Sequence, residues 1–163
     1  MTKKRIAAII IDSILIILTL VFIFGNSLKN VEESTDDSKG VTEIVEKLPP
    51  VHYAIADNKL QKGEIEGFLR SLAHAFEFAL LGAEFMLLLL LAGLKPLSLS
   101  VYLPFFICLI LGVADESLQM LTDRAAEVVD VIKDFAGSLL GGLTVLGIYG
   151  LFRIRNRKKN YQE

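Results

Sequence analysis

Four apolar runs dominate the sequence, and each is close to the length needed to cross a lipid bilayer. They are Ile6 to Phe24, Leu72 to Leu94, Leu97 to Val113, and Val129 to Phe152. A helix needs about 20 predominantly apolar residues to cross a hydrocarbon core of roughly 30 Å. Hydrophobic residues make up 53% of the 163 residues, which exceeds the content of an ordinary soluble domain. We therefore predict an all-α integral membrane protein, a four-helix bundle.

One domain over residues 1–163 accounts for the sequence, which shows no internal repeat or low-complexity tract. The spacing of apolar residues predicts helices at about 6–25, 65–94, 97–119 and 129–153. A basic cytoplasmic tail is expected at 153–163. The connection at 26–64 is predicted to be a partly helical external loop, because apolar residues recur there at helical spacing, namely Val41, Ile44, Val45 and Leu48.

The third apolar run is the shortest of the four. Its continuous apolar part, from Leu99 to Val113, extends only about 22 Å as a helix. To cross the bilayer it must include the residues that follow, which draws Asp115 and Glu116 into the edge of the membrane.

Basic residues predict the orientation, since Lys and Arg beside short membrane segments stay in the cytoplasm. With four spans and both termini inside, one side receives Lys3, Lys4, Arg5, Lys95, Arg153, Arg155, Arg157, Lys158 and Lys159. The acidic 26–70 connection and the short 114–127 connection then lie outside. We predict a multi-pass protein of the cell membrane with both termini cytoplasmic. A cleaved signal peptide is the alternative for the first run, which is long for that role.

Polar residues gather at the rims of the later runs. Arg70, His74 and Glu77 follow the spacing i, i+4 and i+7, so they share one face of the second helix. The third and fourth helices are bordered by Asp115, Glu116, Gln119, Arg124, Asp130 and Asp134. An ionisable side chain at membrane depth costs about 2.5 to 3.5 kcal/mol. These residues are therefore candidates for a ligand-binding polar cluster at the outer leaflet, and the alternative is a structural network in which Arg124 neutralises the acids.

Helical geometry restricts how these side chains can meet. Asp115 and Gln119 are four residues apart, whereas Glu116 projects about 100° away, so both acids reach one target only with help from the loop. On the fourth helix Asp134 lies above Gly137 and Gly141. This small-xxx-small spacing allows two membrane helices to approach closely. We expect it to press the carboxylates against a neighbouring helix.

The polar segments resemble the VanZ-like family of bacterial membrane proteins. The resemblance rests on Arg70-Ser-Leu-Ala-His74-Ala-Phe-Glu77-Phe, on Asp115-Glu116-Ser-Leu-Gln119, and on Arg124, Asp130, Asp134, Gly137 and Gly141. It implies a compact four-helix membrane domain with these polar residues near one end. It also implies a possible role in resistance to the glycopeptide teicoplanin, with which one family member is associated. The family usually has tyrosine in place of Phe78 and asparagine in place of Asp134, so this chain carries an additional acid.

The sequence is compatible with three functions. The first, which we favour, is a non-enzymatic module that binds an anionic or amphiphilic headgroup, such as a lipid, a cell-wall precursor or a lipopeptide-like antibiotic. The second is an enzyme that acts on a lipid-linked substrate at the outer leaflet, with His74 and one of Glu77, Asp115 or Glu116 as acid and base. A divalent cation held by the aspartates is an option within this second hypothesis. The third is a small proton-coupled transporter or flippase that uses Asp12 and Glu84 as relay groups within the bilayer.

No metal or cofactor is predicted, because the sequence lacks a compact ligand motif of the HExxH or DxD kind. The expected partners are membrane lipids or cell-wall precursors, with a second copy of the chain or another membrane protein as further options. The basic tail is interpreted as a topology signal and a contact for anionic lipid, so no nucleic acid is expected.

Overall fold

A computed structural model describes residues 2–29, 31–56, 61–93, 99–122 and 127–159, and every regular element in these ranges is a helix. In chain order they are α1 (Lys3–Ser27), α2 (Val31–Glu46), α3 (Pro49–Ala56), α4 (Lys62–Ala92), the 3-10 helix η1 (Leu99–Tyr102), α5 (Leu103–Gln119), the 3-10 helix η2 (Met120–Thr122) and α6 (Val128–Lys159). The predicted all-α class is confirmed. So is the partly helical segment between the first two long helices, which forms α2 and α3.

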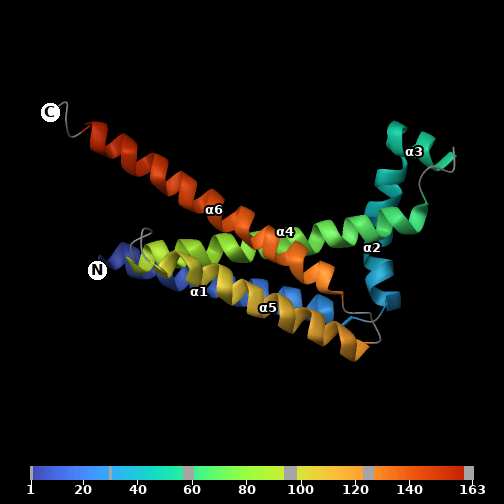
Figure 1. The fold of residues 1–163 in the computed structure, drawn as a ribbon, viewed down its shortest axis with the longest axis horizontal. Coiled ribbons are helices and arrows are strands. Elements are labelled where there is room, and N and C mark those ends of the chain that lie inside the picture. The colour runs from blue at the N-terminus through green and yellow to red at the C-terminus, as the bar shows by residue number, and fades with distance from the viewer. Residues whose placement is uncertain (1, 30, 57–60, 94–98, 123–126, 160–163) are drawn as a thin grey trace.

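Four helices are long and apolar enough to cross a membrane, as predicted: α1, α4, α5 and α6. They run lengthwise and alternate in direction, so α1 begins and α6 ends towards the same end of the molecule (Figure 1). The α2–α3 segment lies at the opposite end (Figure 1). Helix α4 packs against α1, α5 and α6, and its interface with α6 is the most extensive. Any site shared by the four helices is therefore assembled around α4.

Several helix bounds differ from those expected. Helix α6 continues to Lys159, through most of the segment predicted as a tail, because charged residues with good helix propensity extend it. Helix α5 begins at Leu103, after the short η1 turn, with Pro104 in its first turn, where the missing N–H costs nothing. Residues 94–98, where the second helix was expected to end and the third to begin, lie outside the described ranges.

Helices α4 and α6 approach at backbone distance. A Cβ atom on Gly137 would overlap the carbonyl oxygen of Ala75, and one on Gly141 would overlap that of Ala79. From the other side, a Cβ atom on Gly82 would overlap the backbone of Ser138. Small residues permit this approach between membrane helices, where dispersion forces and hydrogen bonds drive association. The same contact brings the first turns of α6, including Asp134, against the bundle.

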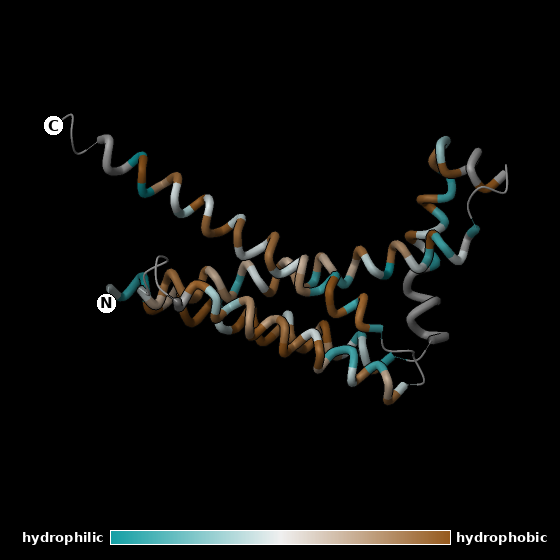
Figure 2. Tube along the Cα trace, viewed as in Figure 1, coloured by the Kyte–Doolittle hydropathy of each residue, from teal (hydrophilic) through white to brown (hydrophobic). Residues whose placement is uncertain are grey.

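The bundle exposes apolar side chains and buries polar ones, the reverse of a soluble protein. The buried residues of α1 lie on one stripe, namely Asp12, Ile16, Thr19, Ile23 and Ser27. Its exposed residues are large and apolar, including Ile10, Ile14, Ile17 and Val21. Figure 2 shows hydrophobic residues along the long helices and hydrophilic residues collected where α1 and α5 end. The outer surface thus suits lipid, and the buried polar residues require partners inside the protein.

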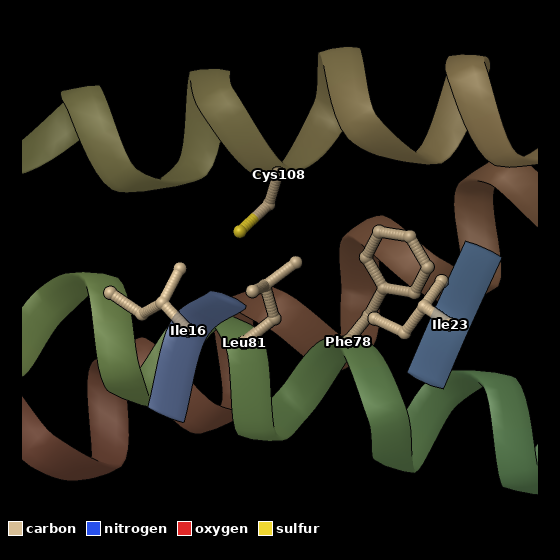
Figure 3. Packing of buried hydrophobic residues seen from close by; sticks show 5 residues of the cluster. All are labelled: Ile16, Ile23, Phe78, Leu81 and Cys108. Carbon is tan, nitrogen blue, oxygen red and sulfur yellow. The ribbon is translucent and has the colours of Figure 1, made fainter. Parts of the chain in front are cut away.

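An apolar core fills the middle of the bundle. Ile16 and Ile23 from α1, Phe78 and Leu81 from α4, and Cys108 from α5 point into one space (Figure 3). Cys108 is the only cysteine in the sequence and is fully buried. We define these five residues as the central core.

The end of the bundle where α1 begins is fastened by Arg5. Its Nε donates a hydrogen bond of 2.5 Å to the carbonyl oxygen of Leu91, in the last turn of α4. Helix α4 then stops at Gly93, which has φ +84°, a left-handed conformation that glycine adopts without strain. A cation at this position satisfies an otherwise orphaned carbonyl and complements the helix dipole.

Candidate functional site

The polar residues meet at the end of the bundle where α1 and α5 end and α6 begins, which we call the polar end. Four carboxylates form its centre, and we define them as the carboxylate cluster: Glu77 from α4, Asp115 and Glu116 from α5, and Asp134 from α6. Asp115, Glu116 and Asp134 are buried, and Glu77 is mostly buried. Such a concentration of acids at the rim of a membrane protein needs compensating donors or cations.

Asp115 is the best-supported member of the cluster. Its side chain is 0% exposed. The Ser27 hydroxyl donates a short hydrogen bond to its Oδ1, and Gln119 Nε2 donates one of 3.0 Å to its Oδ2. Ser27 is the last buried residue on the inward stripe of α1, so the length of that helix delivers the hydroxyl to α5. Asp115 thus accepts from two uncharged donors.

Glu116 faces the same space as Asp115, although helical geometry alone would separate them. Gln119 Nε2 lies 3.0 Å from Glu116 Oε1 and bridges the two acids. The backbone N–H of Glu127, just before α6, donates to Glu116 Oε2 at 3.1 Å. The expected help from the loop therefore comes from a main-chain amide, and the Gln119 amide adds a second tie.

His74 lies between carboxylates of two helices. Its Nδ1 is 3.7 Å from Glu77 Oε2 and 3.9 Å from Asp115 Oδ2. Asn26 Nδ2 donates a hydrogen bond of 3.3 Å to Glu77 Oε1. The predicted face of α4 thus meets α1 through Asn26 and α5 through Asp115. When protonated, His74 supplies a positive charge within reach of both acids.

Asp134 has the most unusual environment of the four acids. Its side chain is 1% exposed, and neither carboxylate oxygen has a hydrogen-bond partner among the described residues. It packs against Gly112 on α5, where a Cβ atom would lie at ordinary contact distance, 3.8 Å, from Asp134 Oδ2. One carboxylate oxygen each of Asp115, Glu116 and Asp134 lie within 4.8 Å of one another.

Three predicted site residues remain to be described: Asp130, Arg70 and Arg124. Asp130 accepts a hydrogen bond of 2.6 Å from Lys133 Nζ, which also donates to Ser71 Oγ at 2.9 Å. Arg70 lies one turn before His74, and its buried Nε has no hydrogen-bond partner in the segments that the structure describes. Arg124 lies outside the described residues, so its predicted role in neutralising the acids stays a prediction.

Sequence reasoning missed the neutral donors. Asn26, Ser27 and the Glu127 amide each hold one carboxylate, and none was expected to belong to the site. A weak signal was present for Asn26 alone, because Asp12, Thr19 and Asn26 recur every seven residues along α1. Such spacing places polar residues on nearly one helical face and indicates an inward-facing stripe.

Acids outnumber cations at the polar end over the described part of the chain. Neutral donors orient Glu77, Asp115 and Glu116, and the charge of Lys29 also acts on Glu77. Chemically, this environment suits an ammonium group, a metal ion or shared protons.

Comparison with known proteins gives one result at the level of the family. No curated protein and no solved structure matches the chain. The family model described as VanZ/LLP1 matches residues 13–153, which include α4 and α5, most of α1 and α6, and all of the polar end. The resemblance drawn from the sequence motifs is thereby confirmed, and the chain belongs to the VanZ/LLP1 family of membrane proteins.

Proposed function

We propose that the polar end binds the headgroup of an anionic or amphiphilic molecule at the outer leaflet of the cell membrane. The observation that carries this proposal is the sequence of charges along one face of α4. The Arg70 guanidinium, with an unpartnered buried Nε, precedes His74, which borders the carboxylate cluster. A molecule that bears both signs of charge finds a donor and several acceptors within a few turns of helix.

An outward orientation of the polar end is part of the proposal. Basic residues are concentrated where α1 begins and α6 ends, including Lys3, Lys4, Arg5, Arg153 and Arg155. Under the positive-inside rule that end faces the cytoplasm. The polar end, at the other end of the bundle, then faces the exterior with α2 and α3 (Figure 1).

Candidate ligands share an amphiphilic character. A lipid, a lipid-linked cell-wall precursor, or a glycopeptide or lipopeptide antibiotic would each place an apolar part in the bilayer and a polar part at this depth. A role in antibiotic resistance is proposed from the resemblance to the VanZ-like family. Binding without catalysis suffices for such a role, if the module sequesters the drug or its target.

The proposal is tested by expressing the chain in a susceptible bacterium and measuring the inhibitory concentration of a glycopeptide and of a lipopeptide antibiotic. We expect the wild-type chain to raise it, and Arg70→Ala and His74→Ala to lose that effect at equal membrane abundance. Arg153→Ala removes a cation from the exposed far end of α6 and is the matched control. Equal protection by all four chains would contradict the proposal.

Orientation is tested separately by labelling with a membrane-impermeant maleimide. Cys108 is buried, so a cysteine placed at an exposed position dominates the signal. Gly40→Cys, on α2, should react in intact cells, and Arg155→Cys, near the end of α6, should react only after lysis. The reverse pattern would place the polar end in the cytoplasm.

A further inference from the structure

We propose that Asp115, Glu116 and Asp134 form a site for a hard divalent cation, best suited to Ca²⁺. The three residues come from α5 and α6 and offer carboxylate oxygens that lie within 4.8 Å of one another. The proposal does not rest on the headgroup function, because the cation would bind to the protein alone.

The first support is the state of Asp134. It is 1% exposed, and within the described part of the chain both of its oxygens lack a hydrogen-bond partner. A buried charge without a partner is strongly unfavourable, and proteins normally pair it or bind a metal with it. One of its oxygens nevertheless lies within reach of two further acids, where repulsion adds to the cost. A cation between the three carboxylates supplies the missing partner.

The second support is the way the other two acids are held. Ser27 and Gln119 donate to Asp115, while Gln119 and the Glu127 backbone amide donate to Glu116. Outer donors of this kind fix the orientation of metal-ligating carboxylates. Hydrogen bonds from these donors favour the ionised form of both acids. A carboxylate has about four acceptor positions, so Asp115 retains capacity for a cation after accepting two hydrogen bonds.

The ligand type and the coordination geometry select the metal. Three carboxylates form an all-oxygen set, which favours Mg²⁺, Ca²⁺ or Mn²⁺ over softer ions. Ca²⁺ accepts about six to eight oxygen ligands in flexible geometry, whereas Mg²⁺ requires near-ideal octahedral geometry and usually retains several waters. Three carboxylates held in place by the packing of two helices therefore suit Ca²⁺ better than Mg²⁺.

The experiment measures Ca²⁺ binding to the full chain in detergent after treatment with a chelator. Equilibrium dialysis with ⁴⁵Ca²⁺ should give one ion per chain, with weaker competition by Mg²⁺. Asp134→Asn keeps the shape of the side chain and should weaken binding by more than about tenfold. Ser27→Ala removes an outer donor and should weaken it by about tenfold.

Asp130→Asn is the matched control, since Asp130 lies one turn earlier on α6 and contacts Lys133 instead of the cluster. It should bind Ca²⁺ as the wild type does. Folded wild-type protein that takes up no stoichiometric Ca²⁺ at millimolar concentration would overturn the proposal and leave a proton as the partner of Asp134. Equal binding by Asp134→Asn and the wild type would also overturn it.

A luminescence measurement on the wild type keeps the test decisive if Asp134→Asn fails to fold. Tb³⁺ also prefers oxygen ligands and reports its bound waters through the difference in lifetime between H₂O and D₂O. A buried three-carboxylate site should displace several waters from the ion, and Ca²⁺ should compete for it. A lifetime typical of a nearly fully hydrated ion would mean adventitious binding at surface acids and would contradict the proposal.

Discussion

Two regions of the bundle bury acids, and they treat them differently. At the polar end, Asp115 receives hydrogen bonds from two helices and lies 3.9 Å from His74. Nearer the middle of the bundle, the described residues give Glu84 one hydrogen bond of 3.0 Å, from Thr19, and no partner for its Oε2. Asp12, nearer the start of α1, also has a buried Oδ2 with no hydrogen-bond partner among the described residues. Among the buried acids that accept hydrogen bonds, the number of helices that supply donors distinguishes the two regions. Asp134 is the exception at the polar end, because none of the described residues donates to it.

The central core lies between these regions. Glu77 and Glu84 are two turns apart on α4, about 10 Å along the axis. Phe78 and Leu81 are both fully buried between them, against Ile23 of α1. Over the described residues this packing interrupts the polar stripe of α1 and α4. The polar end is thus a local network, and the acids near the middle are separate from it.

The largest effect on the polar end is expected from a substitution that separates α6 from α4. Gly137→Leu would force a side chain into the Ala75 carbonyl and push away the turn that carries Asp134. We expect a loss of about 3 kcal/mol of unfolding free energy, the upper part of the usual range for overpacking. Unfolding by sodium dodecyl sulfate in mixed micelles, followed by circular dichroism, measures it.

Gly147→Leu is the matched control on the same helix. A Cβ atom at Gly147 would have no neighbour within 4 Å, so the change should stay within about 0.5 kcal/mol. Similar losses for the two variants would show that α4 and α6 do not depend on the close approach at Gly137.

The comparison also explains which features the sequence could predict. The four long helices follow from the length of the apolar runs, a local property that needs no knowledge of packing. The family follows from short motifs within α4, α5 and α6. The convergence of Asp134 with Asp115 and Glu116 depends on how α6 lies against α5, which periodicity cannot give.

The sequence did not assign the neutral donors to the site, because their role also depends on packing. Ser and Asn occur often near the ends of membrane helices, so Asn26 and Ser27 carried little signal individually. Their role depends on the length of α1 relative to α4 and α5. Only the assembled bundle shows that Ser27 ends beside Asp115 and Asn26 beside Glu77.

A second prediction removes one donor from the polar end. Ser27→Ala leaves Asp115 Oδ1 without its hydroxyl partner in a site that is closed to solvent. Hydrogen bonds to charged groups contribute about 1.5 to 3 kcal/mol, and those in membrane proteins fall at or below the lower end. We expect a loss of about 1.5 kcal/mol in the same unfolding assay. A loss below that of the Thr19 variant described next would remove the distinction between the regions.

Thr19→Val is the counterpart at the middle of the bundle. Valine has nearly the same shape, so the change removes the hydrogen bond to Glu84 and little else. Interhelical hydrogen bonds in membrane proteins contribute about 0.6 kcal/mol on average. We expect a loss near this value, again by unfolding in mixed micelles. A loss above about 1.5 kcal/mol would indicate that Glu84 depends on Thr19 as strongly as Asp115 depends on Ser27.

The smallest effect is expected for Glu84→Gln. The amide carbonyl can still accept from Thr19, and the variant removes a buried carboxylate that has one unpartnered oxygen. The unfolding free energy should change by no more than about 0.5 kcal/mol. Protection against the antibiotics should also persist in this variant, because the central core separates Glu84 from the polar end. Loss of protection with stability retained would instead connect the two regions functionally, and it would favour a relay of protons along α1 and α4 over a headgroup-binding module.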